Sequence, residues 1–126
     1  MAQVKIYGRR DVWASRRAEL SDAIHGALVG AWGLPDDKRF HRFLLLDAED
    51  LVAPRSAQYL VVEIVCFTGR SAQARRALIA ALFDAARGLG LAEEDLETVI
   101  LESPPQNWGI RGQAGDELTL GYRVDV

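Results

Sequence analysis

The residue best placed for chemistry is an arginine at a turn between a strand and a helix, in the stretch FTGRSAQARRA. Gly69 permits a tight turn after an apolar run, and Ser71 is a residue type that caps helix N-termini. Arg70 would then lie beside unpaired backbone N–H groups and the positive end of the helix dipole. A guanidinium combined with backbone amides suits a small carboxylate. A solvent-exposed loop arginine is the alternative interpretation, and the sequence does not favour one over the other.

Two further stretches contain residue types that catalyse or bind. His25, in SDAIHGAL, lies beside the apolar stripe of its predicted helix, where a histidine is most often a solvated or interface side chain. The loop PPQNWGIRG places Trp108 and Arg111 after an apolar strand. We expect Trp108 to fill a subunit contact, with the wall of a pocket as the alternative, and the role of Arg111 stays open. His41 and Arg42 alternate along a predicted strand and so face opposite ways.

Several classes of function find no support in these 126 residues. The single cysteine, Cys66, lies in an apolar run and is interpreted as core packing, so neither an internal disulfide nor a thiolate metal site is expected. No nucleotide-binding glycine loop, metal-ligand cluster or Ser/His/Asp arrangement is visible, so we expect no cofactor. The net charge of −3 gives no general attraction to nucleic acid. No membrane span or signal peptide is visible, so a cytoplasmic protein is expected.

The elements that would position these residues repeat a βαβ pattern within one domain. The first unit lies within 2–47, with strands at 3–8 and 39–47 around a helix at about 14–32. The second lies within 59–103, with strands at 59–67 and 96–103 around a helix at about 71–88. Matching segments, GLPDD and GLAEE, follow the two helices, which indicates a diverged duplication. Residues 104–126 form a C-terminal loop and strand, the strand being predicted from alternation in GDELTLGYRVDV.

The predicted fold class is α+β, a four-stranded mixed sheet with two helices on one face plus the C-terminal strand. The strand at 59–67 is apolar on both faces and is interrupted only by Glu63. Two helices can cover one face of such a sheet, so the other face is expected to pack against further copies of the chain. The expected partner is therefore the protein itself.

The stretches DAIHGALVGAWGLPDD, FTGRSAQARRALIAALF and ESPPQNWGIRG, together with a strand that starts at residue 2, resemble the tautomerase superfamily. The resemblance is to its fused double-βαβ members, which are similar to malonate semialdehyde decarboxylase and 4-oxalocrotonate tautomerase. Order and spacing match along most of the chain. The resemblance implies a homotrimer with an active site near each N-terminus, no cofactor, and small 2-oxo or unsaturated acids as substrates.

The resemblance also implies roles for individual residues. The family's proton carrier is an N-terminal proline exposed by methionine removal, and that position is Ala2 here. The carboxylate-binding arginine falls on Arg70, the helix histidine on His25 and the late tryptophan on Trp108. A second arginine of the family is replaced by Thr68. The carboxylate-binding half of the site is thus partly kept, whereas the acid–base half is not.

Three hypotheses for the function remain open. The first is a weak keto–enol tautomerase in which Arg70 binds the substrate carboxylate and the amine of Ala2 carries the proton once Met1 is removed. Its assisting cations would come from three other arginines: Arg9, Arg42 and Arg111. The second is a trimeric carboxylate-binding or structural module without catalysis. The third is an enzyme that uses another residue of the pocket, such as His25 or Tyr7.

Overall fold

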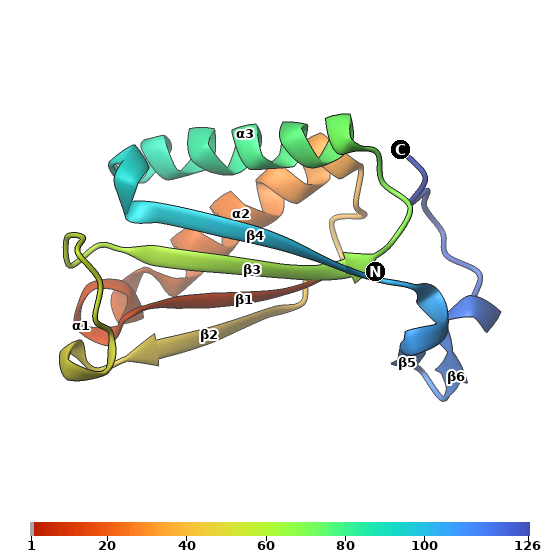
Figure 1. Cartoon of the computed structure of the whole chain (residues 1–126), viewed down its shortest axis with the longest axis horizontal. Helices are drawn as coiled ribbons and strands as arrows, with labels where there is room; N and C mark the ends of the chain where they lie inside the picture. Colours follow the sequence, from red (N-terminus) through yellow and green to blue (C-terminus); the bar gives the residue numbers. More distant parts are fainter. Residues whose placement is uncertain (1) are drawn as a thin grey trace.

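A computed structural model describes residues 2–126 as a four-stranded sheet with two long helices on one of its faces (Figure 1). The strands are β1 (Ala2–Arg9), β2 (His41–Leu46), β3 (Leu60–Phe67) and β4 (Leu96–Ser103), and the helices are α2 (Arg17–Trp32) and α3 (Ala72–Gly88). A short helix, α1 (Arg10–Trp13), and a 3-10 turn lead from β1 into α2. The predicted fold class is confirmed, and the bounds agree with the predicted ranges to within a few residues.

The sheet has the strand order β2-β1-β3-β4. The outer pairs β1/β2 and β3/β4 are parallel, and the central pair β1/β3 is antiparallel. Each parallel pair is closed by one long helix, as a parallel connection requires. The beginning of β1 and the end of β3 therefore meet at the same end of the sheet.

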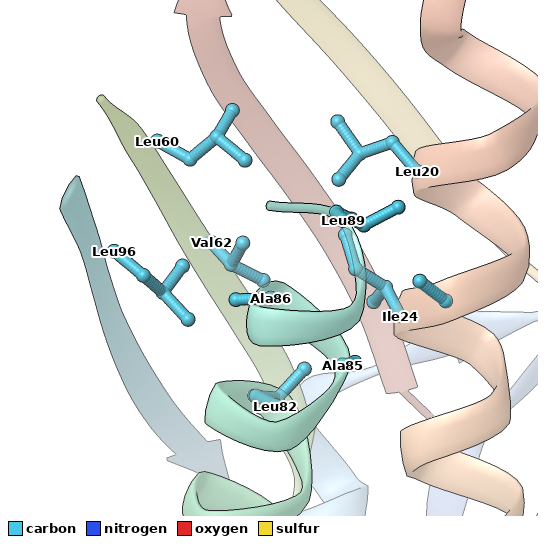
Figure 2. Close-up of a pocket in the computed structure, with 10 residues that line it drawn as sticks. Leu20, Ile24, Leu60, Val62, Leu82, Ala85, Ala86, Leu89 and Leu96 are labelled. Atoms are coloured by element: carbon cyan, nitrogen blue, oxygen red, sulfur yellow. The ribbon is translucent and has the colours of Figure 1, made fainter. Parts of the chain in front are cut away.

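The core lies between the helices and the sheet, because alternate residues of β1 and β3 point toward α2 and α3. Val4, Ile6, Val62 and Ile64 are each 1% exposed or less. A cavity of about 20 Å³ lies in this layer. Figure 2 shows side chains that line it, among them Leu20 and Leu82. Its lining is apolar and offers no polar partners for a water molecule, so the cavity is a packing void and not a ligand site.

The other face of the sheet carries apolar side chains that no helix covers. Val65 and Leu101 pair across β3 and β4 on this open face, and Val99 lies two residues before Leu101. Val99 is 40% exposed and Leu101 46%. Among residues 2–126, no helix is long and apolar enough to cross a membrane.

The C-terminal strand occurs earlier than predicted. Two-residue strands, β5 (Gly109–Ile110) and β6 (Gln113–Ala114), form an antiparallel pair, and the alternating segment after it is irregular. The prediction of a strand through 115–126 is wrong because this segment packs onto the turn between β3 and α3 and not along a sheet edge. A Cβ atom added at Gly69 would lie 3.2 Å from Val124 Cγ1, and the hydroxyl of Ser71 donates to the carbonyl of Val126 at 3.0 Å.

Candidate functional site

Arg70 lies in the turn between β3 and α3, close to the end of the sheet where β1 begins (Figure 1). Gly69 makes the turn possible because its φ of 140° is unfavourable for other residues. The Oγ atom of Ser71 accepts the backbone N–H of Ala74 at 3.0 Å, so the predicted helix cap is confirmed. Arg70 is only 4% exposed, which excludes the interpretation of a solvent-exposed loop arginine.

The guanidinium of Arg70 is buried, and the thiol of Cys66, a weak acceptor, lies near it. Its Nε, Nη1 and Nη2 atoms make no hydrogen bond to any residue within 2–126. Its Cζ atom lies 4.0 Å from the ring centroid of Trp32, whose indole N–H donates to the carbonyl of Ala74 at 3.0 Å. Stacking on the indole returns about 2 kcal/mol at best and satisfies none of the guanidinium N–H groups. The arrangement therefore favours an anion that approaches in the plane of the guanidinium.

The charge of Arg70 is affected by burial and by three neighbours. Burial lowers the pKa of Arg70, whereas the thiol of Cys66, the phenol of Tyr122 and the carboxylate of Glu102 act in the opposite direction. Burial also raises the pKa of Cys66 and of Tyr122. The thiol is therefore protonated and packs in the core, as the sequence predicted.

The structure brings Ala2 to the same end of the sheet as Arg70. Ala2 is the cross-strand partner of Cys66, which precedes the Arg70 turn at the end of β3. Ala2 is 3% exposed. Met1, whose removal would leave the predicted amine on Ala2, lies outside the described residues. Tyr7, the alternative proton carrier, is on the open face toward the far end of β1, opposite Val61.

His25 is buried, whereas a solvated or interface position was expected from its place on the helix. It is 1% exposed, and its Nε2 atom donates to the carbonyl of Asp36 at 2.9 Å because the loop after α2 folds back over this flank. His41 faces α2, where its Nδ1 atom lies 2.7 Å from Ser21 Oγ. Burial, helped by the charges of His25 and Arg39, lowers the pKa of His41 to about 4. The rings of His25, on α2, and His41, at the start of β2, thus lie 5.9 Å apart by centroid.

A metal site would need more ligands than this pair supplies. Within the described range 2–126, no three histidine, cysteine or carboxylate side chains come together as a metal would require.

The three assisting arginines predicted from the sequence lie in different places. Arg9 is at the opposite end of β1 from Ala2 and forms an ion pair with Asp11 at 2.6 Å. Arg42 is on the open face, where its Nη2 atom donates to Gln3 Oε1 at 2.9 Å. Arg111 is exposed in the turn between β5 and β6. Its charge, like that of Arg70, opposes the rise that burial causes in the pKa of Tyr122. Of these three arginines, Arg9 is therefore at the far end of the sheet, Arg42 lies near the Arg70 end but on the open face, and Arg111 lies at the Arg70 end.

Trp108 packs the loop after β4 onto the end of β3. Its ring meets Phe67 edge to face at 5.2 Å, and its indole N–H donates to the carbonyl of Ser103 at 3.3 Å. An open groove of about 350 Å³ lies beside this packing and is lined by Phe67, Thr68, Leu118 and Val124, among others. Trp108 therefore holds the loop that borders this groove, and its predicted role as a subunit contact or as a pocket wall stays a prediction.

Sequence reasoning missed four residues around Arg70. Trp32 and Tyr122 flank its guanidinium, and Arg75 binds Glu102 beside it. The position of Trp32 next to the helix-ending Gly33 was a usable signal, because a terminal helix residue can reach the neighbouring turn. Arg75 is near because it follows Arg70 by five residues at the beginning of α3, whereas Glu102 and Tyr122 come close only through the sheet register and the path of the C-terminal segment.

A duplicated βαβ sheet, with the first strand paired to the strand before the Arg70 turn, defines a tautomerase-type fold, as the resemblance predicted. A family model described as tautomerase enzyme matches residues 38–111, so the chain belongs to this tautomerase family. Native fused 4-OT is 27% identical, with a TM-score of 0.82, over 92% of this chain and 98% of that chain. FG41 malonate semialdehyde decarboxylase inhibited by 3-bromopropiolate is 23% identical, with a TM-score of 0.82, over 94% and 98%.

Proposed function

We propose that this chain binds the carboxylate of a small 2-oxo or enol acid at Arg70 and is a weak keto–enol tautomerase. The observation that carries the proposal is the buried guanidinium, 4% exposed, whose nitrogens have no hydrogen-bond partner among residues 2–126. A structural arginine in such a position would normally be paired, because an unpaired buried charge is costly. A carboxylate fits the planar arrangement of its N–H groups.

Two similar proteins support a carboxylate ligand. Pt0534, 21% identical with a TM-score of 0.83, has been solved after inactivation by 2-oxo-3-pentynoate. The malonate semialdehyde decarboxylase above is inhibited by 3-bromopropiolate. Both compounds are small carboxylates.

The proposed reaction moves one proton and needs no co-reactant. Arg70 holds the carboxylate, which leaves the adjacent oxo or enol carbon directed toward the start of β1. The α-amine of Ala2, free once Met1 is absent, removes a proton from one position of the substrate and returns it at the other. A terminal amine has a pKa of about 8, and burial beside a cation lowers it toward neutrality.

We further propose a homotrimer that buries the open face of the sheet. Val99 and Leu101 are large apolar residues that remain 40% and 46% exposed in one chain. Two similar proteins, R7 and F6 fused 4-OT, are trimers. Size-exclusion chromatography with light scattering tests this assembly, and a stable monomer would contradict it.

The test of the activity is a tautomerase assay with an arylenolpyruvate on protein whose N-terminus is defined by intact-mass analysis. We expect slow turnover by the wild type, loss of turnover in Arg70→Ala, and a gain in Ala2→Pro that still depends on Arg70. Arg76→Ala is the matched control, because Arg76 is an exposed arginine on α3, the helix that follows the Arg70 turn. Turnover that is unchanged in Arg70→Ala would refute the proposal.

A non-catalytic carboxylate-binding module is the second candidate, favoured by Ala2 in place of the family's proline. It predicts carboxylate binding that depends on Arg70 but no turnover by the wild type. The same variants separate the two candidates, because binding without turnover in the wild type and turnover in Ala2→Pro would identify the module.

A further inference from the structure

A carboxylate lies close to Arg70 and yet does not pair with it. Glu102 is the cross-strand partner of Cys66, so it is at the end of β4 next to the Arg70 turn. Its negative charge acts on the guanidinium of Arg70. A buried arginine gains most from a nearby carboxylate, since pairing offsets part of the cost of burying its charge. Something else must therefore bind Glu102.

Arg75 binds it. From the beginning of α3, its Nη1 atom donates to Glu102 Oε1 at 3.0 Å. The same atom donates to the backbone carbonyl of Arg70 at 2.7 Å. About a third or less of each side chain is exposed, 34% for Arg75 and 27% for Glu102, so solvent screens this pair only partly. Arg75 thus neutralises the neighbouring carboxylate and ties down the turn that carries Arg70.

We propose that Arg75 is a positioning residue which, by binding Glu102, keeps the guanidinium of Arg70 free for an external carboxylate. The inference rests on the proposed function, since it concerns the same anion site. Without Arg75, the carboxylate of Glu102 turns to Arg70, satisfies its N–H groups and competes with the ligand. Loss of Arg75 therefore weakens binding of the external carboxylate because Glu102 then occupies Arg70. Removal of the Glu102 charge restores that binding.

The first test measures phenylpyruvate binding by isothermal titration calorimetry. We expect Arg75→Gln to raise Kd at least about tenfold, equivalent to about 1.4 kcal/mol. The double variant Arg75→Gln/Glu102→Gln should return to within about threefold of the wild type, and Arg76→Gln, an exposed neighbour on α3, should leave Kd unchanged. A double variant as weak as Arg75→Gln would overturn the inference, because a structural role for Arg75 is not rescued at Glu102.

The second test needs no ligand. Urea midpoints of Arg70→Met, Glu102→Gln and their combination are measured with Arg75 present and in Arg75→Gln protein. We expect the two substitutions to be nearly additive when Arg75 is present and more strongly coupled when it is absent, since only then do positions 70 and 102 pair. Additivity in both backgrounds would overturn the inference. Coupling without phenylpyruvate binding to the wild type would refute the proposed function alone.

Discussion

Arg70→Met is expected to stabilise the folded protein and to abolish carboxylate binding. Methionine has a similar reach and no charge, so it keeps the contact with Trp32 and removes three buried nitrogens that have no partner among residues 2–126. Most substitutions of a residue that is 4% exposed destabilise, so the sign of this prediction is unusual. The expected gain in stability follows if the guanidinium of Arg70 serves to bind a ligand and does not stabilise the fold.

The magnitude follows from three contributions to the free energy of unfolding. An unsatisfied buried group costs about 1–3 kcal/mol and more when charged, so we take about 3 kcal/mol for the Arg70 guanidinium. The lost stacking on Trp32 subtracts about 2 kcal/mol, and a thioether contact with the indole adds back about 0.5–1 kcal/mol. The net gain is about 1.5–2 kcal/mol. For a chain of this size it corresponds to a rise in Tm of about 4–8 °C.

The assay is urea and thermal unfolding at a fixed protein concentration, in buffer without carboxylates or phosphate, because a bound anion or partner subunit shifts the apparent stability. Phenylpyruvate at a hundred times its Kd should then add about 2.7 kcal/mol to the wild type and nothing to Arg70→Met. Arg76→Met, exposed on α3, should change stability by less than about 0.5 kcal/mol. A lower midpoint for Arg70→Met would refute the reasoning, since it would mean that the guanidinium is satisfied by the protein in solution.

Three other predictions concern pH, packing and assembly. The free energy of unfolding of the wild type should fall by up to about 3 kcal/mol between pH 6.5 and 4, because His41 has a pKa of about 4 when folded and is protonated at higher pH in the unfolded chain. Urea unfolding of His41→Gln over the same pH range should show a smaller fall. An equal fall in both proteins would contradict this prediction. Gly8→Ala should cost about 1–3 kcal/mol in urea unfolding, since its Cβ would lie 2.9 Å from Trp13 Cδ1, and an unchanged midpoint would argue against this close packing. Leu101→Glu should convert the proposed trimer to monomer in light scattering, whereas a trimer that persists in this variant would place the interface elsewhere.

The strands and helices could be predicted because their signals are local. Apolar alternation gives β1, and a nearly continuous apolar run gives β3. Glycines follow both long helices, with Gly33 at a φ of 66° ending α2. The cap of α3 was also readable, because Ser71 is the only capping residue type between Gly69 and the helix. These features depend on residues that are close together in the sequence, so they can be predicted from the sequence alone.

The burial of the site residues could not be predicted, because it depends on contacts between distant segments. His25 is covered by the loop that carries Asp36, and Arg70 by Trp32 and the C-terminal segment around Tyr122 and Val124. Apolar and polar residues do alternate in residues 115–126, but this alternation was interpreted as a strand, which the segment does not form. Its apolar residues line a groove, and periodicity alone does not distinguish a groove wall from a strand.

The antiparallel pair at the centre of the sheet relates the two βαβ units by an approximate two-fold rotation (Figure 1). Gly8 and Arg9 in one unit match Gly69 and Arg70 in the other, so each unit carries a Gly-Arg pair where its first strand ends. Asp11 neutralises Arg9 through two hydrogen bonds, at 3.0 and 2.6 Å, whereas the guanidinium of Arg70 makes no hydrogen bond to residues 2–126. One aspartate therefore makes the two Gly-Arg ends unlike in charge.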